Sequence, residues 1–393
     1  MTSTLTTGFS AVELEARGAV WTAREIAQQP AVWLEVAQLV AREKARLVDF
    51  LAPLLASRDV RIVLSGAGTS AFIGECLAPA LAGRLHRRVD AVATTDIVSG
   101  PNLRLQSDTP TLLVSFARSG GSPESVATVD LAEKTLQSVH HLIITCNPEG
   151  ALARRAPTLR SAQVFVLPDA TNDRGFAMTS SFTSMVLAAG LIFGLIRHES
   201  VPVLCSAADS LLPQVDALAQ RLVAGEFQRV VYLGSNELSG LAAEAALKLL
   251  ELTDGQTVAM AESTLGFRHG PKTIINGRSL VVVMLSNDAY TRAYDLDLLA
   301  ELRKDARAGS ILALTARPDA GAGEQLLFKG MSEVSDIELA LLYILVGQSY
   351  GLAQSLALGV TPDRPNAAGV VSRVVQGVTI HPWREKRDDV PGR

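Results

Sequence analysis

Three side chains in the second half of this 393-residue chain are of the types that move protons. Lys248 and Glu251 lie three residues apart in the stretch Glu-Ala-Ala-Leu-Lys-Leu-Leu-Glu-Leu, so on a helix they share one face. His269 follows in Gly-Phe-Arg-His-Gly-Pro, where glycine and proline indicate a shaped loop. A carboxylate, an ammonium and an imidazole together suit general acid–base chemistry. Spacing alone leaves two other interpretations open, an exposed ion pair and an ordinary loop histidine.

Two loops rich in glycine and hydroxyl side chains stand in the first half. Ser65-Gly-Ala-Gly-Thr-Ser70 follows one apolar run, and Ser115-Phe-Ala-Arg-Ser-Gly-Gly-Ser-Pro-Glu-Ser125 follows another, each opening a predicted helix. Glycine allows a tight turn close to a ligand, and a helix N-terminus offers free N–H groups. The loops therefore predict a cradle for a dianion such as a sugar phosphate. A third cluster, Met178-Thr-Ser-Ser181, is placed to close the same pocket.

These loops have two competing interpretations. Serine, threonine and glycine are also the ordinary residues that cap helices. In addition, Gly66-Ala-Gly-Thr-Ser-Ala71 matches the dinucleotide-binding fingerprint, and Asp96 stands where a ribose-binding acid would follow a second strand. A dinucleotide half-site has no need of the second hydroxyl loop. We therefore favour a sugar phosphate and expect no cofactor and no metal.

The elements around these residues occur twice. The strand-like run Arg61-Ile-Val-Leu-Ser-Gly66 is echoed by Arg229-Val-Val-Tyr-Leu-Gly234, and two further apolar runs repeat at a nearly constant offset of about 170 residues. The first copy carries the hydroxyl loops, whereas the second carries the titratable side chains. This asymmetry predicts one active site per chain, built where the two copies meet.

Short apolar strands rich in β-branched residues alternate with helical stretches in both copies. This pattern is typical of parallel strands covered on both faces, and it predicts an α/β fold of two tandem doubly wound sheets of flavodoxin-like type. The expected strands are 61–64, 89–93, 111–114, 141–144 and 164–167, then 229–233, 256–260, 279–285, 310–314 and 326–328.

We divide the chain into four parts: a helical arm (1–55), a first α/β domain with the phosphate loops (56–205), a second with the reactive side chains (206–360) and a tail (361–393). Residues 1–19 are expected to form a loose lead. Thr22 and Glu25 have the spacing of a capping box, and Pro30 is expected to interrupt the helix that they begin.

Composition narrows the classes of partner. The net charge is −4 and there is no long basic run, which argues against nucleic acid and anionic membranes. The longest lipid-like run found, 185–196, is roughly 12 residues and falls short of the ~20 that span a bilayer. Three scattered cysteines and no signal-peptide pattern favour a reducing cytoplasm.

At these motifs the chain resembles the sugar isomerase (SIS) domain family. The segments GAGTS, SFARSGGSPES and EAALKLLELTDGQTVAMAESTLGFRHGPK carry the resemblance, and the tandem arrangement resembles the isomerase half of glucosamine-6-phosphate synthase. Segments TAREIAQQPAVW, AMTSSFTSM and RVVQGVTIHP are similar to the AgaS group, described as galactosamine-6-phosphate deaminase/isomerases or tagatose-6-phosphate ketose/aldose isomerases. The resemblance covers residues 20–383.

The resemblance implies roles for particular residues. The catalytic glutamate falls on Glu251, the helix lysine on Lys248 and the ring-opening histidine on His269, which in related enzymes reaches the neighbouring subunit's site. The chain is therefore expected to be a homodimer. Substrate contacts are expected from both hydroxyl loops and from the cluster before the long helix: Thr69, Ser70, Arg118, Ser119, Gly120, Ser122, Thr179 and Ser180.

The implied activity converts D-galactosamine 6-phosphate to D-tagatose 6-phosphate and ammonia. Two alternatives remain, a ketose/aldose isomerase without deamination and a non-catalytic sugar-phosphate regulator. The C-terminal lysine that engages the open-chain sugar in the synthase has no counterpart in Asp363–Arg373, where Arg373 is a candidate replacement.

Overall fold

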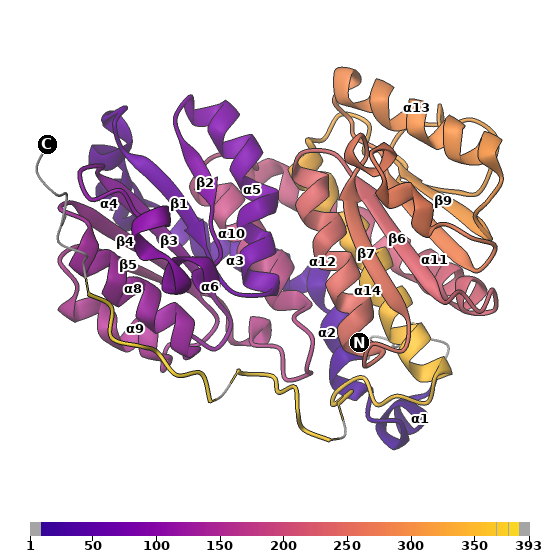
Figure 1. Cartoon of the computed structure of the whole chain (residues 1–393), viewed down its shortest axis with the longest axis horizontal. Helices are drawn as coiled ribbons and strands as arrows, with labels where there is room; N and C mark the ends of the chain where they lie inside the picture. The colour runs from indigo at the N-terminus through magenta and orange to yellow at the C-terminus, as the bar shows by residue number, and fades with distance from the viewer. Residues whose placement is uncertain (1–8, 367, 376, 385–393) are drawn as a thin grey trace, which may run out of the picture.

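The computed structural model describes residues 9–366, 368–375 and 377–384 and contains two five-stranded parallel sheets (Figure 1). Each strand expected from the sequence is present, with its ends moved by three residues or fewer. The first sheet contains β1 (Arg61–Ser65), β2 (Val89–Ala91), β3 (Thr111–Ala117), β4 (Val139–Thr145) and β5 (Ala162–Val166). The second contains β6 (Arg229–Gly234), β7 (Val258–Ser263), β8 (Ser279–Met284), β9 (Ser310–Thr315) and β10 (Gln325–Leu327).

Both sheets have the same strand order, which confirms the doubly wound fold. The first runs β2-β1-β3-β4-β5 and the second β7-β6-β8-β9-β10, with every pairing parallel. In each sheet the order reverses between the first strand and its neighbour, β1 beside β3 and β6 beside β8. Ligands of such sheets bind at the carboxyl ends of the strands flanking this switch point.

Helices cover both faces of the sheets, because the central strands are buried on both sides. Those of the first unit are α5 (Thr69–Leu85), α6 (Thr94–Ser99), α7 (Pro101–Arg104), α8 (Pro123–Thr135), α9 (Ala151–Arg155) and α10 (Ser180–Ile192). Those of the second are α11 (Val201–Val223), α12 (Glu237–Leu252), α13 (Ala289–Asp305) and α14 (Asp336–Ala357). Short 3-10 turns are η1 (Ala156–Thr158), η2 (Asp169–Thr171), η3 (His198–Ser200), η4 (Gly266–Arg268) and η5 (Pro271–Ile274).

The N-terminal arm differs from the expectation in detail. It forms α1 (Ala11–Ala16), α2 (Val20–Ala27), α3 (Gln29–Arg42) and α4 (Lys44–Ala56), so part of the expected loose lead is helical. The capping box expected at Thr22 is wrong, since α2 begins two residues earlier. The Thr22 hydroxyl donates instead to Asp363 in the tail, at 2.8 Å. Pro30 stands near the start of α3, where proline is tolerated.

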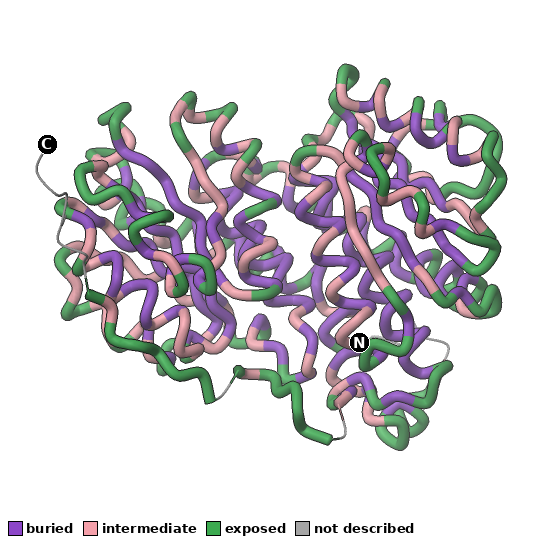
Figure 2. The backbone as a smooth tube through the Cα atoms, in the orientation of Figure 1, coloured by how far each residue is buried: buried purple, intermediate pink, exposed green. Residues whose placement is uncertain are grey.

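The arm packs across both halves of its own chain. Trp33 is wholly buried, and its ring nitrogen donates to Thr183 Oγ1 of α10 at 3.0 Å. Gln29 Nε2 donates to Gln348 Oε1 of α14 at 2.7 Å. One apolar core therefore runs from the arm through both sheets, and Figure 2 shows the buried backbone continuing between the halves. By length and composition α14 could cross a membrane, but its apolar window is fully buried, as in a core helix.

The two halves meet along α5 and α12. Gly240 makes this contact close, because a Cβ added there would lie 2.7 Å from the backbone nitrogen of Cys76. A larger residue would push the helices apart. The packing brings the first residues of α5, which follow the first hydroxyl loop, beside the last turns of α12.

Candidate functional site

A buried cluster of charged side chains lies where α12 meets α5. Lys248 is 0% exposed, and its Nζ donates to Thr69 Oγ1 at 2.8 Å. The same ammonium pairs with Glu251, and it lies 3.4 Å from Oε1 of Glu244. An exposed ion pair is therefore the wrong interpretation of the Lys248–Glu251 spacing. Only Glu251 of the three side chains reaches solvent, being 23% exposed.

Glu244 was not singled out from the sequence, although it stands one helical turn before Lys248. Burial, together with the negative charge of Glu251, raises the pKa of Glu244 to about 8, against the opposing effect of Lys248. Burial works against the ammonium form of Lys248, but the charges of Glu244 and Glu251 outweigh it and raise the lysine pKa. The cluster is therefore a lysine held cationic between a buried carboxyl and a partly exposed one.

The hydroxyl loops end at the same edge of the first sheet, on either side of its switch point. Neither α5, which follows Gly68, nor α8, which follows Ser122, begins with a side-chain cap. The ordinary-cap interpretation therefore fails for both helices. Gly120 has a φ of +64°, and a Cβ there would lie 3.2 Å from Gly150 Cα. Glycine thus fits both the turn and the close packing.

A cavity of about 110 Å³ lies between these loops. This volume has room for a group of phosphate size, since one water molecule needs about 10–15 Å³ on the same measure. Ser119 and Ser122, which the sequence predicts as phosphate contacts, line it together with Ser70 and Arg118. Its other wall is the tail, since Arg373, Val374 and Val375 face the loops; the remaining lining residues are Ala67, Phe116, Ala117, Ser125 and Met178.

Arg118 connects the loop to the tail. Its guanidinium is buried and donates to the carbonyls of Phe176, at 3.1 Å, and Arg373, at 2.9 Å. Burial lowers the pKa of Arg118, and the nearby charge of Arg373 acts in the same direction. Two arginine side chains beside one small cavity make it attractive to an anion.

Thr179 and Ser180 do not line this cavity. Both are 0% exposed, and the Asp173 carboxylate accepts hydrogen bonds from their backbone N–H groups and hydroxyls. The Ser180 hydroxyl also bonds the arm, donating to the Glu25 carbonyl at 3.0 Å. From this cluster it is Met178 that reaches the cavity, and the Ser70 hydroxyl lies 3.9 Å from its sulfur.

His269 is not bonded to the charged cluster of its own chain. It follows η4 and is exposed, and in the part of the chain that the structure describes it makes no hydrogen bond or ion pair with Lys248 or Glu251. The adjacent Leu265 is 44% exposed and Val258, on the edge strand β7, is 51% exposed.

The matching end of the second sheet is occupied by the chain itself. The Asp336 carboxylate accepts from the backbone nitrogen of Asn287 at 2.7 Å and from the Ser286 hydroxyl. Four carboxylates line the adjoining cavity, from Glu237, Asp288, Glu333 and Asp336, against a single cation, Arg317. A phosphate would meet carboxylates there, so the two copies differ in the way that the sequence indicated.

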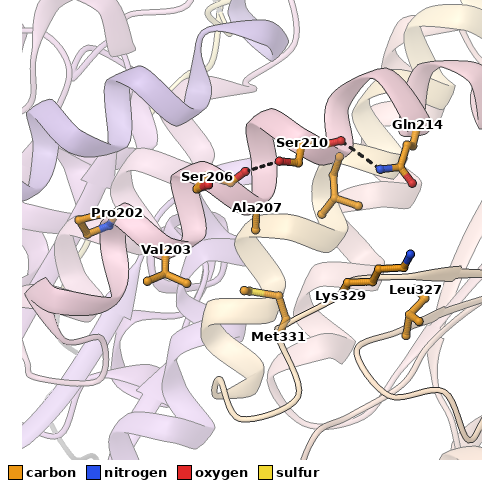
Figure 3. Close-up of a pocket in the computed structure, with 10 residues that line it drawn as sticks. Pro202, Val203, Ser206, Ala207, Ser210, Gln214, Leu327, Lys329 and Met331 are labelled. Atoms are coloured by element: carbon orange, nitrogen blue, oxygen red, sulfur yellow. Dashed lines mark hydrogen bonds between the residues drawn. The ribbon is translucent and has the colours of Figure 1, made fainter.

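A larger cavity, of about 580 Å³, lies between α11 and the loop after β10 (Figure 3). Lys329 is the only titratable side chain among its lining residues, and the Ser210 hydroxyl is engaged by the Ser206 carbonyl at 2.9 Å. This cavity offers no acid–base pair. Among the described residues, no group of three His, Cys, Asp or Glu side chains is placed to hold a metal ion.

Comparison with known proteins gives the family. The SIS domain model matches residues 54–194. The AgaS protein of Streptomyces coelicolor is 52% identical, over 92% of this chain and 96% of that protein, and D-galactosamine-6-phosphate deaminase AgaS of a Shewanella species is 44% identical, over 95% of each. The crystal structure of tagatose-6-phosphate ketose/aldose isomerase from Escherichia coli is 41% identical, covers 93% of this chain and 97% of that one, and superposes with a TM-score of 0.87. The chain therefore belongs to the AgaS group of SIS-domain proteins.

Proposed function

We propose that this protein is an amino-sugar phosphate deaminase/isomerase that converts D-galactosamine 6-phosphate to D-tagatose 6-phosphate and ammonia. The observation that carries the proposal is the contact of Lys248 with Thr69, which joins a carboxylate–ammonium cluster from one half to a hydroxyl loop from the other. The similarity to D-galactosamine-6-phosphate deaminase AgaS over nearly the whole chain supports the same substrate.

In this proposal the substrate phosphate occupies the cavity between the two hydroxyl loops. Ser119 and Ser122 donate to it, the backbone of Gly120 approaches it, and Arg118 and Arg373 supply positive charge. Thr69 and Ser70 lie between the phosphate and the charged cluster and would contact the sugar. Thr179 and Ser180 would act indirectly, because Asp173 engages them and thereby fixes the segment that carries Met178.

The reaction is an internal proton transfer. His269 assists ring opening by moving a proton between the ring oxygen and the C1 hydroxyl. Glu251 then takes the C2 proton of the open-chain aldehyde, giving an enol, and returns a proton to C1, which leaves an imine at C2. Water hydrolyses the imine to the ketone and releases ammonia. Lys248, which pairs with Glu251, places a positive charge beside the reacting atoms and stabilises the developing oxyanion.

We further propose that the protein works as a cytoplasmic homodimer with shared sites. His269 is exposed, and among the described residues it makes no hydrogen bond with the charged cluster of its own chain. This supports a role for His269 in the partner subunit's site. Val258 and Leu265, the exposed apolar side chains near this loop, would be covered in such a dimer.

A specific observation favours a second candidate, a ketose/aldose isomerase without deamination. The solved relative from Escherichia coli bears that activity in its name, and the proton transfer at C1 and C2 would use the same residues. The two activities differ in one product, because only the deaminase releases ammonia.

A panel of substrates tests the proposal. Galactosamine 6-phosphate, glucosamine 6-phosphate, galactose 6-phosphate and tagatose 6-phosphate would each be assayed for ammonia and for the isomerised sugar. We expect ammonia and tagatose 6-phosphate in equal amounts from galactosamine 6-phosphate. Glu251→Gln is the control for the site, and its turnover should fall by about 100-fold or more. Isomerisation of galactose 6-phosphate without ammonia from either amino sugar would select the second candidate, and binding without turnover would favour a regulator.

A further inference from the structure

The loop that carries His269 is held to α13 by charged side chains on both sides of the histidine. Arg268 Nε donates to Glu301 Oε2 at 2.8 Å. Lys272 pairs with the other oxygen of Glu301 and also with Asp305, one turn further along α13. Glu301 therefore engages one cation before and one cation after the histidine.

We call these four side chains, Arg268, Lys272, Glu301 and Asp305, the clamp. The clamp restrains a loop that has little regular structure of its own. Residues 266–274 form two short 3-10 turns joined at Gly270, whose φ is +120°. Phe267 is wholly buried and anchors the first turn, but His269 and Gly270 are exposed. The direction of the imidazole thus depends on what holds the loop on either side of it.

The charges in the clamp support one another. The hydrogen bond from Lys272, more than the charge of Arg268, lowers the pKa of Glu301, which remains ionised at neutral pH. Burial opposes the charged form of Lys272, but the hydrogen bonds to Asp305 and Glu301 outweigh it and raise the pKa. The four side chains are 20% to 36% exposed, so solvent screens each single pair, but together they form a network of two cations and two carboxylates and not an isolated surface pair.

We propose that Glu301 is a positioning residue, which acts by fixing Arg268 and Lys272 so that His269 is presented in one orientation to the substrate. The proposal rests on the proposed role of His269 in ring opening. A misplacement of about 1 Å can cost a catalytic group about 100-fold in rate, so loss of the clamp should lower turnover without abolishing substrate binding.

Three isosteric variants test it. Glu301→Gln removes the charge that both loop cations share, and Asp305→Asn removes only one partner of Lys272. Glu324→Gln is the matched control, because Glu324 pairs with Arg221 at 3.4 Å on another surface of the same half. We expect kcat to fall by about 10-fold or more for Glu301→Gln, by less for Asp305→Asn and not for Glu324→Gln, with KM within about 3-fold of the wild type.

Mixed dimers distinguish positioning from general damage. Glu301→Gln, on α13, and His269→Ala should both impair the loop that carries His269. Each variant should therefore be rescued by the same partner variants as the other. Glu251→Gln should restore both if sites are shared, and the two loop variants should not restore each other. A difference between the two loop variants in these mixtures overturns the role of Glu301. If Glu301→Gln keeps full turnover while His269→Ala is inactive, the positioning role of Glu301 is overturned and the proposed function stands. Full turnover of His269→Ala would instead overturn the role of His269 in ring opening, on which the proposal rests.

Discussion

Lys248 Nζ, near the end of α12, lies 2.8 Å from the hydroxyl oxygen of Thr69, the first residue of α5. This contact between the two halves of the chain links the charged cluster to the small cavity between the hydroxyl loops. The two residues are 179 positions apart, yet the duplicated fold makes their meeting natural. Each helix follows the first strand of its own sheet, and the two helices pack against each other at Gly240.

Replacement of Lys248 by methionine should destabilise the protein in a pH-dependent way. The substitution leaves Glu244 wholly buried without its cation, and breaking a buried pair typically costs about 3–5 kcal/mol. Because the pKa of Glu244 is already about 8, this carboxyl can take up a proton below that pH and escape part of the cost. Urea unfolding should therefore show a larger loss of stability at pH 9 than at pH 6.

The double variant Lys248→Met/Glu244→Gln provides the control. It removes the buried charge together with its partner, so it should regain much of the stability lost at pH 9 while remaining inactive. A double variant no more stable than Lys248→Met would show that the cost lies in packing and not in the unpaired carboxyl.

Mixing two inactive variants should restore activity if His269 serves the partner subunit. Glu251→Gln and His269→Ala each leave one half of every site intact. In a hybrid dimer one site receives both intact halves, so statistical exchange should return about a quarter of the wild-type turnover per subunit. The measurement is ammonia release after subunit exchange. The extent of exchange is monitored by mass spectrometry of isotope-labelled chains. No recovery despite confirmed exchange would place His269 in its own chain's site.

The sequence predicted the sheets better than the arm. Strands such as 111–117 are continuous apolar runs, because parallel strands are buried on both faces, and such runs are legible without any partner. Thr22 and Glu25 fit a local capping rule, but their hydrogen bonds go to Asp363 and to Arg174 and Gly175. These contacts span about 150 to 340 positions, and no local pattern encodes them.

The sequence indicated which residue types form the candidate site, but not that its charged side chains are buried. Helical spacing placed Lys248 beside Glu251, yet it also fitted a solvated pair, and only packing against α5 distinguishes the two. The same packing brings Glu244 into the charged cluster. Its spacing of one helical turn from Lys248 is the signal in the sequence that could have identified it. The hydroxyl-rich run at Thr179 and Ser180 indicated a ligand loop. In the fold, however, these hydroxyls satisfy the buried Asp173.

Arg373 should matter for substrate binding more than for chemistry. Its side chain donates to Asn172 Oδ1 at 3.2 Å and to the Asp173 carbonyl, and its own carbonyl accepts from Arg118. Replacement by alanine removes both the anchor of the tail and a positive charge beside the cavity. We expect KM for the sugar phosphate to rise by about 10-fold, in line with a charged hydrogen bond worth about 1.5–3 kcal/mol.

Arg384→Ala is the matched control, since Arg384 is an exposed arginine of the same tail. It should keep the wild-type KM. Steady-state kinetics in parallel with inorganic phosphate inhibition would check both variants, because a weakened phosphate site must also raise the inhibition constant. A fall in kcat with an unchanged KM for Arg373→Ala would instead assign the side chain to the reacting end of the sugar.

Glu25 should make the stability of the fold fall as the pH rises. Burial, and then the charge of Asp173, raise the pKa of this carboxyl to about 8, although the N–H groups of Arg174 and Gly175 oppose the shift. Between the ordinary pKa of a glutamate and pH 8, the folded chain holds a proton that the unfolded chain has lost, so the free energy of unfolding declines through this window.

Glu25→Gln keeps an acceptor for the two N–H groups but cannot ionise. Its thermal midpoint should therefore fall less between pH 5 and pH 9 than that of the wild type, whereas Glu35→Gln, on the exposed face of α3, should follow the wild type. Equal slopes for all three proteins would mean that Glu25 stays charged in the fold, held by the two N–H groups and not by a proton.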